Sequence, residues 1–446
     1  MLDQSFSIEN FRKILDYENR KGIYLEGKYF PAVETISKKI KGLTHEIKRE
    51  KRYPSPLVSD ELLASKIDEL ATLKETKEDL LNKELKEIRD IVLLSKFRIQ
   101  ISKNDSFGDK PIYRIEDNAQ NYLTLKQLQY NFRKLYKVKQ ANRFAILSQL
   151  KGLLGDGFPK FVIRTDIQNF YESIPHDKVL KKLNEENLLT FYSKKILFQI
   201  FAEYRRLSGS DCGLPRGIGL SAYLSELFMR DVDNEIKSLP GVSYYARYVD
   251  DIVIIFTPEK NETCGFLAKI KEIIETKYKL LLNPTKTKKY DLLETPSSKL
   301  LEYLGYKIKF GNGTIKFTLS AKKIERYKFR IQKALDAYLN YSKVDEKYAR
   351  QIFVRRLRFL SGNTRLLNNK KNILVGVYFS NNLLSNSEDF ANLDKYYSHL
   401  IASKVSNENA RKRLLNFSFA QGFTTKKFSR FDTSDLIEIF EIWRDN

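Results

Sequence analysis

The stretch Tyr244–Phe256, YYARYVDDIVIIF, decides the fold around which the chain is organised. Apolar and β-branched residues flank Asp250 and Asp251, so both flanks are predicted to be strands of a β-hairpin with the two acids at its turn. Neighbouring carboxylates repel each other and gain nothing from a core. Two interpretations follow: the acids bind a divalent cation, since hard cations prefer carboxylate oxygens, or they form an ordinary solvated turn.

The composition indicates a globular chain with a polyanionic partner. The 446 residues allow two or three domains, and 79 Lys and Arg against 56 Asp and Glu leave a net charge of +23. This surplus favours nucleic acid as the partner, and the alternative explanation is a generally basic, Lys-rich proteome. With only Cys212, Cys264 and three His, neither a disulfide framework nor a zinc cluster is expected. No apolar run reaches membrane-spanning length and no signal peptide is recognisable, so a cytoplasmic protein without membrane contact is expected.

Residues 161–310 carry the densest pattern, and the expected fold class is α+β. Strands are predicted at Phe161–Ile167, in the hairpin, and at Lys299–Ile308 and Thr314–Phe317. Helical patterns fill the gaps between them, which predicts an antiparallel sheet with helices on one face. The helical segments are expected at 177–184, 191–206, 221–236 and 262–278.

The flanking regions are predicted to be mainly helical. The expected division is a helical N-terminal region at 1–100, a central domain at 101–320 and a helical C-terminal domain at 321–446. Further helices are predicted over 59–94, 144–154, 321–341, 348–360, 388–405, 407–417 and 433–444. The alternation of acids and bases along 59–94 indicates a solvated face.

Asp166 supplies the acid that the hairpin lacks. It ends the predicted strand at 161–167, and a strand-end acid can lie beside a hairpin acid in one sheet. Asp166 and Asp250 could then bind two cations a few ångströms apart, an arrangement that stabilises the attacking and the leaving oxygen in phosphoryl transfer. This chemistry needs no His or Cys nucleophile, in agreement with their scarcity.

Five motifs in order make the chain resemble a reverse transcriptase, with the right-hand palm of nucleic-acid polymerases. Each motif alone is weak, but together they span about a third of the chain. They are RTDIQNFYESI (164–174), GLPRGIGLSAYLSELFM (213–229), YVDD (248–251), LNPTKTKKY (282–290) and LEYLGYKI (301–308). The resemblance implies a central domain of fingers and palm, a thumb-like C-terminal domain and RNA-directed DNA polymerase activity.

The resemblance also implies a catalytic centre. Asp166, Asp250 and Asp251 would be the catalytic acids and metal ligands, and the backbone carbonyl of Ile167 would add a ligand. Two Mg²⁺ ions, or Mn²⁺ in their place, would be the cofactors.

Further roles follow for residues around the nucleotide and the primer. Tyr171 matches the aromatic that excludes a 2′-hydroxyl, and its alternative is a ring that faces the core. Arg216 and Gly217 would line the nucleotide, although viral members usually have Gln at the Arg216 position. The remaining expectations are Lys286 near the leaving pyrophosphate or simply solvated, Lys139 and Arg143 as a triphosphate clamp, and Leu304 and Gly305 as the primer grip.

The C-terminal helices are expected to contact a nucleic-acid duplex or a partner RNA through basic side chains. The alternative is a helical bundle whose exposed faces happen to be basic. The candidate side chains are Arg326, Arg330, Arg355, Arg356 and Arg358.

Among reverse transcriptases, the chain resembles the bacterial defence-associated class, the unknown-group and abortive-infection enzymes, with a weak preference for the type 3 two-polymerase system. The spelling YVDD and Arg216 carry this resemblance. It implies dNTPs as substrates, a dedicated noncoding RNA as template, a DNA product that acts against phage, and a second reverse transcriptase or another copy of the chain as partner.

Alternatives remain open at this level. Within the family they are a retron or a group II intron enzyme, and template-independent DNA synthesis. Outside it they are an RNA-dependent RNA polymerase, which Tyr171 disfavours, and an RNA-binding protein with a relic palm, which the three intact acids disfavour.

Overall fold

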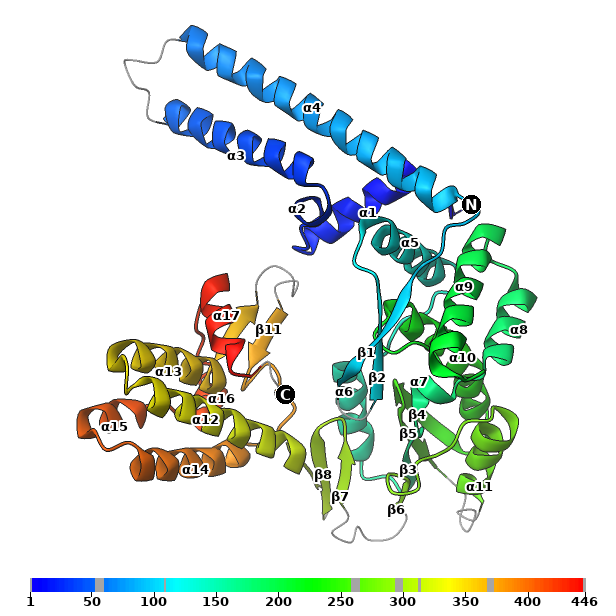
Figure 1. Ribbon diagram of the computed structural model, residues 1–446. Coiled ribbons are helices and arrows are strands. Elements are labelled where there is room, and N and C mark those ends of the chain that lie inside the picture. Colours follow the sequence, from blue (N-terminus) through cyan, green and yellow to red (C-terminus); the bar gives the residue numbers. More distant parts are fainter. Residues whose placement is uncertain are drawn as a thin grey trace. The chain divides into compact units, whose positions relative to one another are not determined.

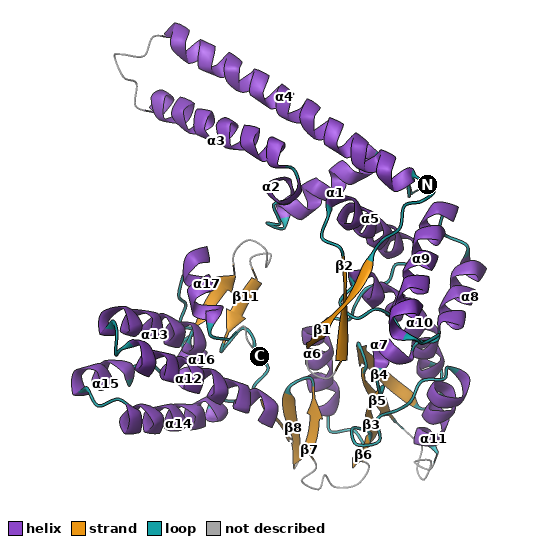
Figure 2. Ribbon diagram, viewed as in Figure 1, coloured by secondary structure: helices purple, strands orange, loops and turns teal. Residues whose placement is uncertain are grey.

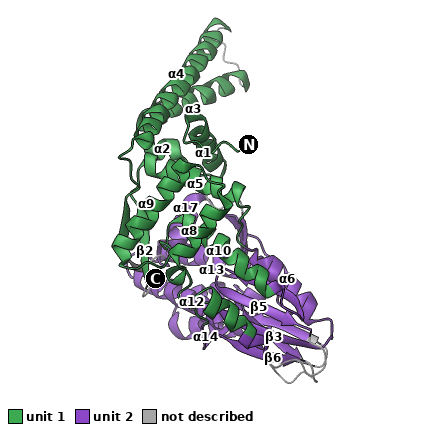
Figure 3. Ribbon diagram, turned by 90° about the vertical axis from the view of Figure 1, so that its right-hand side faces the viewer, with its two compact units in different colours: residues 1–140, 167–236, 269–282 green, residues 141–166, 237–268, 283–446 purple. Residues whose placement is uncertain are grey.

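The computed structural model describes residues 2–52, 60–107, 110–257, 265–292, 300–311, 314–366 and 373–443. Helices alternate with strands whose pairings are antiparallel, which confirms the mixed α+β class (Figure 1; Figure 2). The chain divides into two compact units (Figure 3). Unit 1 comprises Met1–Gln140, Ile167–Ile236 and Lys269–Leu282, and unit 2 comprises Ala141–Asp166, Lys237–Ala268 and Asn283–Asn446.

A four-stranded antiparallel sheet lies at the centre of unit 2. Its order is β4-β5-β3-β6, so β3 and β5 occupy the two inner positions. Both inner strands have apolar and β-branched residues in their middle, at 161–163 and 252–256, which are buried on both faces of the sheet. The strand bounds are β3 (Lys160–Asp166), β4 (Val242–Tyr248), β5 (Asp251–Phe256) and β6 (Lys288–Leu292).

A second antiparallel sheet and a set of helices complete unit 2. The sheet has the order β7-β8-β9, and its inner face shares one hydrophobic core with the four-stranded sheet and the C-terminal helices. The bounds are α6 (Arg143–Leu154), β7 (Leu300–Tyr303), β8 (Tyr306–Gly311), β9 (Thr314–Leu319), α12 (Ala321–Tyr341), α13 (Glu346–Ser361), β10 (Asn363–Leu366), β11 (Ile373–Gly376), α14 (Glu388–Lys404), α15 (Glu408–Leu414), α16 (Phe419–Thr424) and α17 (Thr433–Glu441).

Two of the C-terminal helices, α13 and α17, begin at clear capping residues. Asp345 accepts a hydrogen bond from the backbone of Tyr348 at the start of α13, and Asp432 and Asp435 form a capping box at the start of α17. Helix α12 packs against α13 and α14, and α13 packs against α17. The stacked rings of Tyr338 and Phe353, with centroids 5.0 Å apart, join α12 to α13.

Unit 1 is helical apart from one β-ribbon. Helices α3 and α4 pair as a long hairpin, and α1, α4 and α5 pack together. The bounds are α1 (Ile8–Arg20), α2 (Leu25–Tyr29), α3 (Pro31–Arg52), α4 (Asp60–Leu93), β1 (Ile101–Phe107), β2 (Lys110–Ile115), α5 (Ala119–Leu135), α7 (Phe170–Ser173), α8 (His176–Glu186), α9 (Phe191–Ser208) and α10 (Gly219–Lys237).

The structure refines several expected elements. The helix expected over 262–278 is α11 (Phe266–Lys271) continued by a π-helical turn, η1 (Glu272–Lys277), and residues 262–264 lie outside the described part of the chain. The strand expected over 299–308 is split into β7 and β8 by a turn at Leu304 and Gly305. Strand β6, the β10–β11 pair and α16 had no distinct sequence signal. Among the described residues, no helix combines the length and apolar character that crossing a bilayer requires.

Candidate active site

Two carboxylates meet at one end of the four-stranded sheet. Asp166 is the last residue of β3 and Asp251 is the first residue of β5, and the two are direct register partners. Side chains of directly opposite residues in an antiparallel pair point to the same face, with Cβ atoms about 5 Å apart. Asp166 is only 4% exposed. The sheet therefore brings two acids together where little water can screen their repulsion.

The hairpin turn places the third acid beside them. Tyr248 and Asp251 are register partners, so Val249 and Asp250 alone form the connection between β4 and β5. Val249 has a φ of 62°, a left-handed conformation that is strained for a β-branched residue. Such strain is usually retained at positions that the surrounding structure or the function requires.

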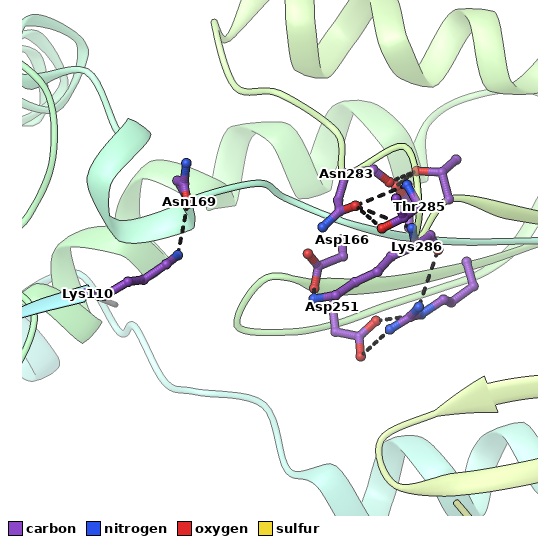
Figure 4. Close-up of polar contacts among 10 residues, drawn as sticks. Lys110, Asp166, Asn169, Asp251, Asn283, Thr285 and Lys286 are labelled. Atoms are coloured by element: carbon purple, nitrogen blue, oxygen red, sulfur yellow. Dashed lines mark hydrogen bonds and ion pairs between the residues drawn. The ribbon is translucent and has the colours of Figure 1, made fainter. Parts of the chain in front are cut away.

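Two cationic side chains compensate the acids (Figure 4). Arg164 donates to both carboxylate oxygens of Asp251, from Nε at 3.0 Å and from Nη2 at 3.1 Å. Lys286 Nζ donates to Oδ2 of Asp166 at 2.8 Å. Burial nevertheless raises the pKa of Asp251 to about 6, aided by the charges of Asp166 and Asp250 and opposed by Arg164. Protonated Asp251 is therefore favoured by burial, and ionised Asp251 is favoured by Arg164.

The turn before β6 positions Lys286. The backbone N–H of Asn283 donates to the carbonyl oxygen of Asp166 at 2.7 Å, and the side-chain oxygen of Asn283 accepts from Thr285. The hydroxyls of Thr165 and Thr287 lie 2.7 Å apart and join the same turn to β3. The motif LNPTKTKKY thus fastens a lysine to the strand that carries Asp166.

The donor set suits a hard divalent cation. Asp166, Asp250 and Asp251 offer only carboxylate oxygens, which Mg²⁺ and Mn²⁺ prefer. The raised pKa of Asp251 indicates a site where added positive charge would be stabilising. In the described residues, no three His, Cys, Asp or Glu side chains converge as a preformed cluster. A cation would meet carboxylates that already accept hydrogen bonds from Arg164 and Lys286.

Unit 1 holds the nucleotide-side candidates Tyr171, Arg216 and Gly217. Arg216 donates to both carboxylate oxygens of Glu172, at 3.0 and 3.1 Å, and its guanidinium lies 5.4 Å from the ring centroid of Tyr171. The Arg216 carbonyl oxygen accepts from the N–H of Tyr113 in β2 at 2.7 Å. Gly217 has a φ of 99°, and an added Cβ would come within 2.6 Å of the Tyr113 carbonyl oxygen.

Lys110 contacts both Asn169 and Glu172, and the sequence had not identified it as a site residue. Lys110 Nζ donates to Oδ1 of Asn169 at 2.9 Å (Figure 4). It also lies 3.8 Å from Oε2 of Glu172. Two cations on one carboxylate make the Tyr171 neighbourhood electropositive, as a triphosphate requires.

The two predicted clamp residues lie in different units. Lys139 is exposed in the segment before α6, in unit 1. Arg143, in unit 2, donates to the Leu304 carbonyl oxygen from Nε at 3.1 Å and also from Nη2, and its guanidinium lies 5.6 Å from the Tyr306 ring centroid. In this structure Arg143 thus supports the turn at Leu304 and Gly305, which both adopt positive φ.

Two of the five C-terminal arginines differ from expectation. Arg356 is 4% exposed and donates to the Glu438 carbonyl oxygen at 3.0 Å, so direct contact with a duplex is corrected to a structural role in holding α17. Arg355 forms ion pairs with Asp435 and Glu438, at 3.1 and 2.9 Å, and is already neutralised. The amphipathic pattern of α13 does not reveal these partners, because they lie in α17, about 80 residues later in the sequence.

The other three arginines remain accessible. Arg326 and Arg330 line a hollow of about 140 Å³ together with Lys323, and the guanidinium of Arg330 lies 5.5 Å from the Trp443 ring centroid. Arg358 is exposed.

Sequence reasoning missed Arg164, although a signal was present. It precedes Asp166 by two residues in β3, and side chains at i and i+2 of a strand share a face. The alternation alone therefore places a guanidinium beside the acids, while only the structure shows that Asp251 is its partner.

Comparisons with known proteins agree with this geometry. Residues 94–308 match the family described as reverse transcriptase (RNA-dependent DNA polymerase), so the chain contains a reverse transcriptase domain. No curated protein matches the chain.

Solved structures that are similar to the chain include three yeast telomerases, all at low identity. Apo telomerase from Candida tropicalis has a TM-score of 0.40 and 16% identity over 78% of this chain and 62% of its own. The Candida tropicalis apo telomerase truncated from its C-terminal domain has a TM-score of 0.35 and 13% identity, over 50% of this chain and 55% of its own. Telomerase from Candida albicans in complex with a TWJ fragment of telomeric RNA has values of 0.35 and 14%, over 80% and 66%. The chain thus spans less than two thirds of the length of each.

Proposed function

We propose that the domain at residues 94–308 makes this chain an RNA-directed DNA polymerase, a nucleotidyltransferase that adds dNMPs to a growing strand. The register pair of Asp166 and Asp251, with Asp250 in the adjoining turn, is the observation that carries the proposal. Buried acids in direct opposition weaken a sheet. Their retention is explained by a reaction that needs concentrated negative charge at this point.

The acids would hold two divalent cations, Mg²⁺ in the first place and Mn²⁺ as a substitute. When bound, such cations stabilise the attacking 3′-oxygen and the leaving pyrophosphate oxygen. Asp166 and Asp250 would be the main ligands, Asp251 would be the third acid, and the backbone carbonyl of Ile167 would add a ligand. Arg164 keeps Asp251 ionised and oriented through its two hydrogen bonds. Lys286 would release Asp166 to the cations and present its ammonium group to the pyrophosphate.

Tyr171 is the proposed sugar-selecting residue. A rigid ring excludes a 2′-hydroxyl by steric overlap, which favours dNTPs. Arg216 holds that ring from one side while Glu172 fixes the guanidinium, so the ring has a supported position. Gly217 allows the chain to pass close to β2, and Lys110 and Arg216 would attract the triphosphate. Lys139 would add charge to the triphosphate, and Arg143 would hold the primer-grip turn at Leu304 and Gly305.

The biological setting that we propose is bacterial antiphage defence in the cytoplasm. The YVDD spelling and Arg216 support the defence-associated class over retrons. In that setting a dedicated noncoding RNA would be the template, and a second reverse transcriptase or another copy of the chain would be a partner.

One experiment tests the polymerase proposal without assuming a template. The protein is purified, its co-purifying RNA is sequenced, and DNA that it makes from labelled dNTPs is sequenced. DNA complementary to one co-purifying RNA would support the proposal. DNA without any complement would favour template-independent synthesis, and the absence of DNA synthesis under every metal condition would contradict polymerase function.

A further inference from the structure

A second hollow in unit 2 lies away from the carboxylates. It has a volume of about 500 Å³ and is formed by the C-terminal end of α13, the C-terminal end of α15 with the residues that follow it, and the segment between α16 and α17. Its walls contain four cations and two aromatic rings. They are Arg358, Arg413, Lys427, Arg430, Phe417 and Phe431. We call these six residues the basic groove.

The basic groove is built on a fixed backbone. Asn363, which is 1% exposed, donates its N–H to the Lys427 carbonyl oxygen and accepts from the N–H of Ser429, both at 2.8 Å. Its side chain donates to the same Lys427 oxygen at 3.1 Å. Gly422 lies so close to Ser361 that an added Cβ would fall 1.7 Å from that carbonyl oxygen. The segment that carries Lys427 and Arg430 is therefore held in place before any ligand arrives.

The charge of the basic groove is uncompensated. Arg358, Arg413, Lys427 and Arg430 are all exposed, and within the described part of the chain none of their side chains forms an ion pair. Neighbouring cations on the same helices behave differently: Arg350 pairs with Glu346 at 3.0 Å, and Lys412 pairs with Glu408 at 2.8 Å. Four clustered cations repel one another, so the groove is set up to attract an anion with several charges.

The aromatic rings narrow the choice of anion. Phe431 is 7% exposed and packs on Phe359 at 6.0 Å between centroids, so it forms the floor. Phe417 is half-buried and offers a ring to the hollow. Proteins bind single-stranded nucleic acid with cations that contact the phosphates and with aromatic rings on which bases stack. A hollow of this size is in the ~300–1,000 Å³ range that takes a nucleotide-sized group.

We propose that the basic groove binds a single strand of nucleic acid, with backbone phosphates at Arg358, Arg413, Lys427 and Arg430 and one base against Phe417. An open groove with exposed cations suits a strand that passes through, whereas a free nucleotide needs polar groups that close around it. The groove would hold template or product outside the reaction centre. Binding of a strand in the basic groove does not depend on polymerase activity.

The test uses the full-length protein with EDTA and no dNTPs, so that synthesis is silent. A fluorescent 4-thiouridine RNA and a 4-thiothymidine DNA of the same sequence are cross-linked by light, and the modified peptides are mapped by mass spectrometry. Cross-links at residues 413–431 are expected for at least one oligonucleotide. Their absence for both strands would overturn the proposal, even if the reaction centre still bound the strands elsewhere.

Anisotropy titrations over a salt series supply the second arm. The double variant Arg413→Gln/Arg430→Gln should lower affinity by about 10-fold or more and reduce the log–log salt slope by about 1.4, since each lost phosphate contact on a single strand removes about 0.7. Phe417→Ala should weaken binding about 10-fold with an unchanged slope.

Matched controls separate local from general charge effects. Arg350→Gln/Lys412→Gln removes the same two charges from paired positions, and its affinity and slope should stay near those of the wild type. An equal loss of affinity and salt slope in both double variants would mean that the groove contributes only non-specific positive charge, which would contradict the proposal. Complete competition by micromolar ATP or dATP would also contradict it, in favour of a free-nucleotide site.

Discussion

Asp166 and Asp251 are direct partners across the antiparallel strands β3 and β5. Lys286 donates a hydrogen bond to Asp166, and Arg164 donates to Asp251. The pairing puts two like charges on one face of a buried sheet. Burial raises the pKa of Asp251 to about 6; Arg164 opposes this shift, and the charges of Asp166 and Asp250 add to it. The buried pair links the fold to the proposed chemistry, because divalent cations would favour the ionised form of both carboxylates.

The rate of DNA synthesis should depend on the ionisation of Asp251. Below pH 6 the carboxyl takes up a proton and competes with a cation, so the rate should fall up to tenfold per pH unit. Raising the Mg²⁺ concentration should move this acid limb to lower pH. Single-turnover incorporation measured from pH 5 to 8 at two Mg²⁺ concentrations checks both points, and a flat profile down to pH 5 would contradict the assignment.

The raised pKa of Asp251 also predicts how stability depends on pH: unlike the rate of synthesis, the contribution of this group to stability is larger at low pH. Between about pH 4 and 6 the folded chain holds a proton on Asp251 that the unfolded chain has lost, so this group's contribution to stability falls as pH rises through that window. Saturating Mg²⁺ should raise the melting temperature more at pH 7.5 than at pH 5. An equal shift at both pH values would mean that the cation binds elsewhere.

Lys286→Gln should lower kcat for dNMP addition by about 100-fold, the usual effect of removing one preorganised group that stabilises developing charge. The KM for dNTP should change much less, because the ammonium group in this structure lies on Asp166. Lys289→Gln, which removes an exposed lysine of β6, is the control and should retain wild-type kinetics. A Lys286 variant with unchanged kcat would mean that the lysine only balances charge.

Tyr171→Ala should increase incorporation of ribonucleotides, lowering the preference for dNTPs by roughly 10–100-fold. The loss of the ring removes the steric barrier and the surface under the Arg216 guanidinium. Tyr171→Phe keeps the ring and should keep the preference. Competition between dNTPs and rNTPs in primer extension measures the ratio, and an unchanged preference in the Ala variant would end the sugar-selection role.

Lys323→Met should stabilise unit 2 by about 1–3 kcal/mol at pH 6.5. Lys323 is 8% exposed, and burial lowers its pKa to about 7, aided by Arg143 and Arg326. Between pH 7 and 10.5 the unfolded chain holds a proton that the folded chain lacks, so the wild type gains stability as pH rises. Urea unfolding should therefore show a smaller advantage for Met at pH 9, with exposed Lys322→Met as control; the same difference at both pH values would contradict the burial argument.

Local patterns were enough to predict the framework of the site. Runs of apolar and β-branched residues predicted β3 and the β4–β5 hairpin, and both are confirmed. Helical periodicity predicted α9, α12 and α14 to within a few residues. These elements are decided by which face must be buried, and that information is carried by neighbours in the sequence.

Partners from distant sequence were beyond such reasoning. The pairing of Arg216 with Glu172, of Arg143 with Leu304, and of Arg356 with Glu438 joins residues between 44 and 161 positions apart. A basic residue in a motif reads the same whether its charge is free or already satisfied. The π-helical turn η1 was missed for a related reason, since its widened geometry leaves no distinct periodicity in six residues.

We propose that the carboxylates of β3 and β5 support nucleotidyl transfer. The most direct measurement is labelled dNMP incorporation by Asp166→Asn compared with Asp291→Asn, an exposed acid of the same sheet, after both show wild-type melting behaviour. Loss of the metal ligand should cost several kcal/mol of transition-state stabilisation, a fall of about 10³-fold or more, while the Asp291 variant remains active. DNA synthesis at wild-type rate by Asp166→Asn would contradict the account.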